Sequence, residues 1–495
     1  MKTVRFPRIF LASFAICVAA VAPATAATPK ECPPHLAADA AVVPQSMEQA
    51  DINSGAVSFK EIVEHGKNLF AARFNTCDGS GRPETTGGGA KRAIPTVSDG
   101  GEPVSAGQVN KLRTSAPDAD SCAGCHNQPE IGGHGDFVAN VFVLAQGLDP
   151  VTFSVSPLFS NNRNTVGMHG AGAIEMLARE MTADLQAQFA ALPSVAGTYT
   201  LTAKGVDFEI EIDDAKNVTH AEGIDHDLVI KPFHQAGKVV SLREFSNNAM
   251  NHHHGMQAEE RFDLNPAKGF DPDFDADGYQ RELTIGDQTA ISIWQAQLPV
   301  PKQVRASKKG KKQVLRGERT FSSIGCASCH VPSMELNSRL YTEPNPYNPP
   351  GTCNNTGDLA GECPDYSFDM TRVSGLEKAK KGKAIVRAFT DLKRHNLCDP
   401  VGPGAIRWFC NEELAQGRPD QDGRPGSEFF LTRKLWDVGN SAPYGHRGDV
   451  PTITEAILYH GGEARASRDA FAALDVSSQR EIVNFLKTLQ AVPSK

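Results

Sequence analysis

Two short motifs in the chain bring cysteine and histidine together at a fixed spacing. The first reads Cys-Ala-Gly-Cys-His at residues 122–126, and the second reads Cys-Ala-Ser-Cys-His at residues 326–330. Two thiols one helical turn apart can form thioethers with the two vinyl groups of one haem, and the adjacent imidazole then reaches the iron as its proximal ligand. The sequence therefore predicts two covalently bound haem c groups, attached through Cys122, Cys125, Cys326 and Cys329 and ligated by His126 and His330.

Other uses of paired cysteines fit this spacing less well. Zinc knuckles of the C-x-x-C type lie about 15–20 residues apart, whereas roughly 200 residues separate these two motifs. A thioredoxin-like redox pair would need a βαβ context, which the surrounding sequence does not provide. Haem attachment is therefore the favoured interpretation of both motifs.

Composition limits the classes of protein that remain. The 495 residues are 40% apolar, which is enough to bury a core, so wholesale disorder is excluded. The formal net charge is -8, and no strongly basic face is implied, so nucleic acid is not an expected partner.

The first 26 residues have the pattern of a signal peptide. Lys2, Arg5 and Arg8 precede an apolar run over residues 9–21, and a small-residue cleavage site follows at residues 24–26. The apolar run is short for a membrane span, and no later stretch is apolar enough to be one. We therefore expect an exported, periplasmic protein without a membrane span.

Six further cysteines are expected to form disulfides in an oxidising compartment. Cys353 with Cys363 and Cys398 with Cys410 are the closest pairs, which would leave Cys32 to pair with Cys77. Six cysteines allow 15 arrangements, so the sequence leaves the connectivity open.

The residues around the motifs predict a mainly α fold with two cytochrome c-like haem domains, long loops and a small antiparallel β insertion. Ser58 and Glu61 form a capping box ahead of a helical apolar stripe that ends at Phe74, and Ser478 with Glu481 opens a C-terminal helix. A short helix over residues 317–321 leads into the second motif, and residues 199–202, 206–212 and 228–232 alternate like strands. The predicted divisions are a signal peptide (1–26), an N-terminal arm with the first cytochrome-type helix (27–115), a first haem domain (116–300) with its β insertion (about 197–235), and a second haem domain (301–495). Residues 299–312, at the boundary between the two haem domains, are expected to be a surface linker.

A candidate calcium loop lies at residues 273–284. Asp273, Asp275, Asp277 and the following glycine match the first half of an EF-type loop, in which alternate carboxylates converge on the ion. Glu282 stands two positions before the usual bidentate glutamate, so the match is partial. An acidic surface turn is the alternative.

The sixth ligands of the two irons decide the chemistry, because a doubly ligated iron transfers electrons and an open one can bind peroxide. For the first haem the candidates are His169 and the triplet 252–254 with His254, followed by His134 and Met168. For the second haem His395 leads, with His446 and Met370 behind it.

Several runs of this sequence resemble the bacterial di-haem oxidoreductase family, which is described as putative peroxidases or thiol oxidoreductase-like proteins and is related to the di-haem cytochrome c peroxidases. The resemblance spans nearly the whole mature chain, at residues 65–83, 121–129, 172–175, 251–261, 391–395 and 435–463, the last with Pro-Tyr-Gly-His-Arg-Gly and His-Gly-Gly-Glu. It implies two facing haem domains, one relaying electrons from a small donor protein (a cytochrome or a cupredoxin) to another that handles peroxide or a similar oxidant.

The resemblance also implies roles for single residues. Glu175 follows His169 on an expected helix and would serve as the acid–base group in peroxide cleavage, with a surface carboxylate as the alternative. Independently of the resemblance, Arg163, Arg243 and Arg447 are candidate partners of haem propionates, because a guanidinium can bind a carboxylate through two hydrogen bonds. Two other functions stay open, namely a non-catalytic di-haem electron carrier and a di-haem enzyme that oxidises a protein side chain or an organic substrate.

Overall fold

The computed structural model describes residues 30, 32, 34–80, 119–141, 161–234, 236–262, 279, 281–308, 310–354, 362–410 and 428–492. The predicted signal peptide lies outside these residues. Within them, no helix is both long enough and apolar enough to cross a membrane.

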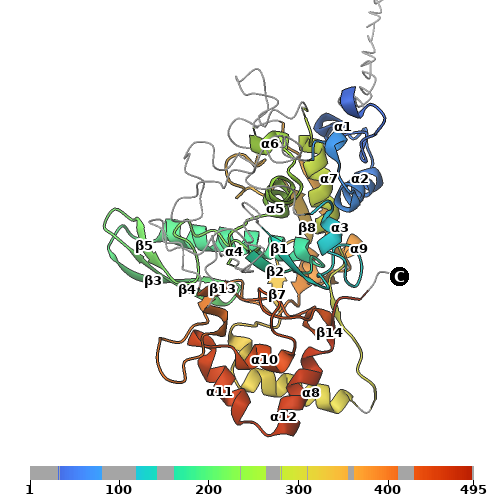
Figure 1. Cartoon of the computed structure of the whole chain (residues 1–495). Helices are drawn as coiled ribbons and strands as arrows, with labels where there is room; N and C mark the ends of the chain where they lie inside the picture. Colours follow the sequence, from blue (N-terminus) through green and yellow to red (C-terminus); the bar gives the residue numbers. More distant parts are fainter. Residues whose placement is uncertain are drawn as a thin grey trace, which may run out of the picture.

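The described chain is mainly α-helical, as predicted (Figure 1). Its α-helices are α1 (Gln49–Ser54), α2 (Phe59–Ala71), α3 (Cys122–Cys125), α4 (Ala171–Ala191), α5 (Leu242–Ala249), α6 (Glu259–Phe262), α7 (Ile285–Ala296), α8 (Lys311–Ser323), α9 (Met370–Val373), α10 (Ile453–Leu458), α11 (Arg465–Ala473) and α12 (Val476–Leu486). A π-helical turn, Met250–His254, continues α5.

The strands form small sheets whose pairs are all antiparallel in the described residues. They are β1 (Val138–Val141), β2 (Asn161–Asn164), β3 (Gly197–Ala203), β4 (Val206–Ile212), β5 (Val218–Ala221), β6 (Lys302–Gln303), β7 (Met334–Leu336), β8 (Leu340–Glu343), β9 (Tyr366–Asp369), β10 (Glu377–Lys378), β11 (Ala384–Val386), β12 (Arg394–Asn396), β13 (Phe429–Leu431) and β14 (Leu489–Gln490).

Helices α2 and α7 cross closely in the N-terminal half. The predicted capping box of Ser58 and Glu61 starts α2. Gly66 faces α7 so closely that an added Cβ would lie 2.0 Å from the carbonyl oxygen of Ala290, so only glycine permits this approach. One turn further along, Phe70 packs on Trp294 with ring centroids 4.4 Å apart.

Helices α8 and α12 repeat this crossing in the C-terminal half. An added Cβ on Gly317 would lie 2.0 Å from the carbonyl oxygen of Glu481. Four residues later, Phe321 packs on Phe485 with centroids 5.6 Å apart. In Figure 1, α8 and α12 lie together in the lower part of the molecule, while α2 and α7 lie in the upper part.

The predicted C-terminal helix forms, but two of its details differ. The helix begins at Val476, and its N-cap is Asp475, whose side chain accepts from the backbone N–H groups of Ser477 and Ser478. Leu489, predicted on the apolar face of the helix, belongs to β14, which pairs with β6. The segment predicted as a surface linker therefore also supplies a strand.

The β insertion contains three strands, and the third lies earlier than predicted. Strands β3 and β4 match the alternating runs, but β5 is Val218–Ala221, and no strand covers residues 228–232. Leu228 has a φ of 57°, a left-handed conformation that breaks an extended run. Figure 1 shows this sheet projecting from the rest of the molecule.

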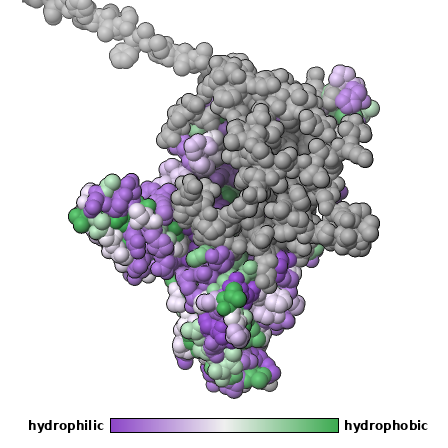
Figure 2. Space-filling view, turned by 60° about the vertical axis from the view of Figure 1, so that its left-hand side comes forward, coloured by the Kyte–Doolittle hydropathy of each residue, from purple (hydrophilic) through white to green (hydrophobic). Residues whose placement is uncertain are grey.

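All three expected disulfides form, between Cys32 and Cys77, Cys353 and Cys363, and Cys398 and Cys410. The four cysteines of the two motifs take part in no disulfide. In the lower part of Figure 2, the visible surface mixes hydrophilic and apolar residues without a continuous apolar face.

Candidate functional site

The first motif forms helix α3, directly beside α2. Nδ1 of His126 lies 3.2 Å from the carbonyl oxygen of Gly133, which accepts the Nδ1 proton and leaves the Nε2 lone pair to a metal. The Phe70 ring lies 5.9 Å from the imidazole. Burial lowers the pKa of His126 to about 4, so the imidazole is neutral at ordinary pH, as a metal ligand must be.

The second motif has the same arrangement. A 3₁₀ turn, Cys326–Ser328, follows α8, and Nδ1 of His330 lies 3.1 Å from the carbonyl oxygen of Phe389. The Phe321 ring lies 6.3 Å from this imidazole. Burial lowers the pKa of His330 to about 4 as well. Two separate parts of the chain therefore present neutral imidazoles with the same tautomer.

These residues fit a haem. Both motif histidines are half-buried, so part of each imidazole stays open to a bound group. The thiols of Cys122 and Cys326 are held in their neutral form, because burial raises their pKa to about 12 and about 11. Two thiols and one imidazole per motif are the donor set that haem c uses.

A second imidazole approaches the first motif from the π-helical turn that follows α5. His254 lies with Nε2 3.2 Å from Sγ of Cys122, and its Nδ1 is 2.8 Å from the carbonyl oxygen of Ala119. His253 lies close enough to His126 for its charge to contribute to the lowered pKa of that residue. Of the predicted triplet at residues 252–254, the structure describes the side chains of His253 and His254.

A second imidazole also approaches the second motif, and sequence reasoning missed it. His460 follows α10, its Nδ1 is 2.7 Å from the carbonyl oxygen of Ala456, and its charge contributes to the lowered pKa of His330. Burial lowers the pKa of His460 too. The signal was present in the run His-Gly-Gly-Glu, but that run carried only the family resemblance.

His395, the leading candidate at the second motif, is held by two carboxylates. Its Nε2 lies 2.8 Å from Asp391, and its Nδ1 lies 2.6 Å from Glu463. Burial opposes its charge, but hydrogen bonds with Asp391, Cys329 and Glu463 raise its pKa to about 12. His395 is therefore an imidazolium beside Cys329, and in this arrangement neither nitrogen offers a lone pair to iron.

Comparison with known proteins finds a family similarity in the C-terminal part of the chain. Residues 367–489 match a family described as di-haem oxidoreductase, putative peroxidase. The match confirms the resemblance seen in the sequence, over a narrower range that starts after the second motif. It contains His395 and His460.

Two other comparisons do not point to a family. No curated protein matches the chain. A solved structure of Kuenenia stuttgartiensis hydrazine synthase, pressurised with 20 bar xenon, aligns over 98% of this chain and 99% of its own at 12% identity, with a TM-score of 0.35. A score this low does not establish a shared fold.

The structure also describes the surroundings of the other candidate sixth ligands. His446 stacks on Phe430 at 4.8 Å, and Met370 is buried in the main core. His169 and Met168 are buried at the start of α4, where His169 lines a cavity of about 130 Å³ between the halves and lies 3.5 Å from Glu130. His134 is buried near His169.

Glu175 lies in a buried network of charges. Its carboxylate pairs with Arg179 and accepts from the backbone N–H of Leu242 at 2.9 Å, from Tyr341 at 3.2 Å and from Asn345 at 3.0 Å. The side chain has no exposed surface. A carboxylate held by four donors is poorly placed to move protons during turnover.

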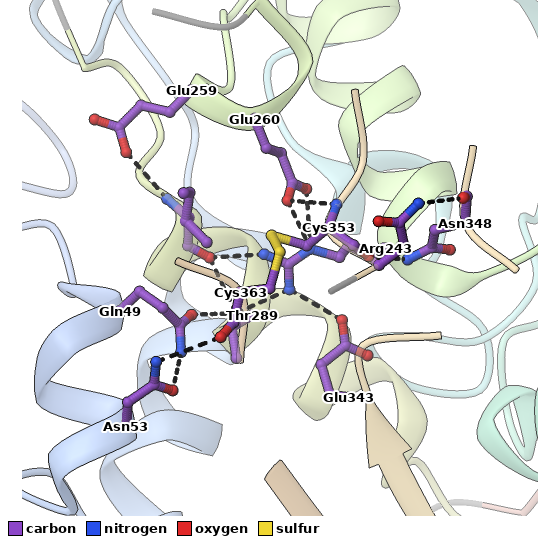
Figure 3. Close-up of a disulfide and its surroundings, with 12 residues drawn as sticks. Gln49, Asn53, Arg243, Glu259, Glu260, Thr289, Glu343, Asn348, Cys353 and Cys363 are labelled. Atoms are coloured by element: carbon purple, nitrogen blue, oxygen red, sulfur yellow. Dashed lines mark hydrogen bonds and ion pairs between the residues drawn. A yellow bond between two sulfur atoms is a disulfide. The ribbon is translucent and has the colours of Figure 1, made fainter. Parts of the chain in front are cut away.

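The same network holds Arg243, which the sequence offered as a propionate partner. The Arg243 guanidinium is fully buried and pairs with Glu260 at 2.8 Å and Glu343 at 2.9 Å, beside the disulfide of Cys353 and Cys363 (Figure 3). Its positive charge is therefore matched within the protein. Arg447 pairs with Asp449 at 3.0 Å. The side chain of Arg163 is not among those that the structure describes.

Of the candidate calcium ligands, only Glu282 lies within the described residues. Its carboxylate accepts from the backbone N–H of Gln257 at 2.6 Å and from the side-chain amide of the same residue at 3.3 Å. Asp273, Asp275 and Asp277 lie outside the described residues, so the calcium loop stays a prediction.

Proposed function

We propose that the chain is an exported di-haem c-type cytochrome that acts as a peroxidase-like oxidoreductase. The observation that carries this proposal is the duplication: each motif histidine has its Nδ1 on a backbone carbonyl, at Gly133 and at Phe389, beside a helix pair closed by a glycine. A zinc or dithiol site would not require the same helix pair at both motifs. The family match supports the haem and the oxidoreductase class.

The four thiols of the motifs would hold the two haems, and His126 and His330 would ligate their irons. A haem iron exchanges single electrons, and it binds peroxide where its sixth position is vacant or displaceable. The carbonyls of Gly133 and Phe389 orient the two imidazoles and raise their basicity as ligands.

We assign the electron-accepting role to the C-terminal site and the oxidant chemistry to the N-terminal site. His460 is fixed by its own hydrogen bond at the end of a helix, which suits a permanent sixth ligand. The imidazoles of His253 and His254 lie on a π-helical turn, an element that recurs at functional sites and can rearrange. A small cytochrome or cupredoxin would supply electrons, and peroxide or a similar oxidant would accept them.

The principal rival is an electron carrier in which both irons keep two protein ligands. It is favoured by the second imidazole near each motif histidine, at His253 and His460. The two functions differ in whether the sixth coordination position of the N-terminal iron could become vacant.

Spectra of the purified protein with peroxide assays test the proposal. The account expects steady peroxide turnover and a high-spin haem in the half-reduced protein. His460→Ala should convert one low-spin haem to high spin and slow donor-dependent turnover, while His220→Ala, an exposed histidine on β5, should change neither. Two low-spin haems in every redox state, without turnover, would establish the carrier instead.

A further inference from the structure

A single side chain joins the two motif histidines across the halves of the molecule. On the C-terminal side, Nδ1 of His330 lies 3.1 Å from the carbonyl oxygen of Phe389, and the adjacent carbonyl of Ala388 accepts from the backbone N–H of Leu435 at 2.9 Å.

On the N-terminal side, Nδ1 of His126 lies 3.2 Å from the carbonyl oxygen of Gly133, and the adjacent carbonyl of Gly132 accepts from the backbone N–H of Met168 at 2.9 Å. Hydrogen bonds therefore connect each motif ring to a segment next to the junction.

Lys434 closes the gap between these two segments. It precedes Leu435, and its Nζ donates to the carbonyl oxygen of Gly167 at 2.6 Å, where Gly167 precedes Met168. Because Lys434 and Leu435 are adjacent, as are Gly167 and Met168, the route between the rings runs through covalent bonds and five hydrogen bonds.

The surroundings hold Lys434 in this position. Its side chain is only 10% exposed, and Asp437 lies 3.4 Å from Nζ as a counter-charge. Gly167 has no room for a side chain, since an added Cβ would lie 2.6 Å from Asp437. A buried ammonium is costly unless it is paired, so the placement is specific.

We propose that Lys434 is the electronic bridge between the two iron sites. This rests on the proposed function, because it requires a haem at each motif. Electron tunnelling weakens less along covalent and hydrogen-bonded atoms than across a gap between atoms, so removing the Lys434 contact leaves a gap in the route. One electron leaves the C-terminal site, which is oxidised, and reaches the N-terminal site, which is reduced.

The nearest competing route passes through an aromatic ring of the same segment. Trp436 is buried, and an added Cβ on Gly170 would lie 2.5 Å from its indole. The indole packs on Gly170, next to His169, and the contacts described for it reach neither motif histidine. The hydrogen-bonded route through Lys434 is continuous from one ring to the other.

Flash reduction of the intact di-haem protein measures the bridge directly. One electron is delivered by a soluble photoreductant, and absorbance follows its equilibration between the haems. Lys434→Met should slow equilibration at least several-fold with both haem spectra unchanged, and Lys434→Arg should keep most of the rate. Lys231→Met removes another half-buried lysine, paired with Asp225 at 2.5 Å and away from the route, and should have no effect.

Three results would overturn the proposal. The first is a wild-type rate in Lys434→Met, and the second is a slow rate in Trp436→Phe when Lys434→Met is normal. The third is a wild-type rate in Lys434→Gln, which is shorter and uncharged and replaces the Met variant if that one folds poorly. Wild-type protein with fewer than two haems would instead refute the proposed function, so the two failures are distinguishable.

Discussion

The N-terminal and C-terminal halves contain the same unit with different additions. In each, a glycine closes a helix crossing, a phenylalanine four residues later packs near the motif histidine, and a backbone carbonyl accepts the Nδ1 proton. In the C-terminal half the motif follows its helix at once, with Cys326 five residues after Phe321. In the N-terminal half about fifty residues separate Phe70 from Cys122.

The halves also differ in what surrounds the motif cysteines. His254 lies beside Cys122 with its Nδ1 at the carbonyl oxygen of Ala119, whereas His395 lies beside Cys329 between two carboxylates. The N-terminal half adds a buried charge network around Arg243 and Glu175. On the proposed function, the shared unit would hold the iron in each half, and the additions would account for any difference in chemistry.

The largest effect is expected where the two halves are most alike. Gly66→Ala and Gly317→Ala each force a Cβ to within 2.0 Å of a facing carbonyl, so we expect each to lower the free energy of unfolding by about 3 kcal/mol. Urea unfolding measures this. Gly402→Ala, where an added Cβ meets nothing within 4 Å, should be neutral. Strongly unequal losses from the two crossings would break the equivalence of the units.

The next effect concerns the buried charge network around Glu175, which the N-terminal half adds to the shared unit. Glu175→Gln leaves Arg179 buried without its carboxylate, so we expect a loss of about 2 kcal/mol in the free energy of unfolding with peroxide turnover per haem unchanged. Glu180→Gln, on the same helix and partly exposed, should cost less. Loss of turnover in folded Glu175→Gln protein would restore its role as the acid–base group.

The smallest effect is expected at His395 and depends on pH. Its pKa is raised to about 12 in the folded chain, above the ordinary value near 6.5. Its contribution is therefore fully present below about pH 6.5 and is lost progressively as the pH rises toward 12. His395→Gln should cost about 1 kcal/mol at pH 6 and less at pH 9 by urea unfolding. A cost that grows with pH would contradict this assignment.

Local signals in the sequence predicted most of the fold near the motifs. The capping box of Ser58 and Glu61 forms because its two hydrogen bonds involve residues three apart, and all three disulfides join the expected cysteines. The third strand could not be placed, because the left-handed backbone at Leu228 overrides an alternating pattern.

The surroundings of the site depend on contacts between distant segments, which spacing does not reveal. Glu175 looks like an available carboxylate on a helix until Tyr341 and Asn345 close around it from far along the chain. His395 is held in its charged form by Asp391, four residues before it, and by Glu463, which reaches it from another segment. His460 gained meaning when the fold brought it near His330.

The measurement that tests the central claim most directly is the intact mass of the protein, isolated from cells that mature c-type cytochromes. The account predicts a mass increase of two haems per chain that survives denaturation, with one haem lost when Cys122 and Cys125 are replaced by Ser and one lost when Cys326 and Cys329 are replaced. A wild-type chain that carries no covalent haem, or only one, would contradict it.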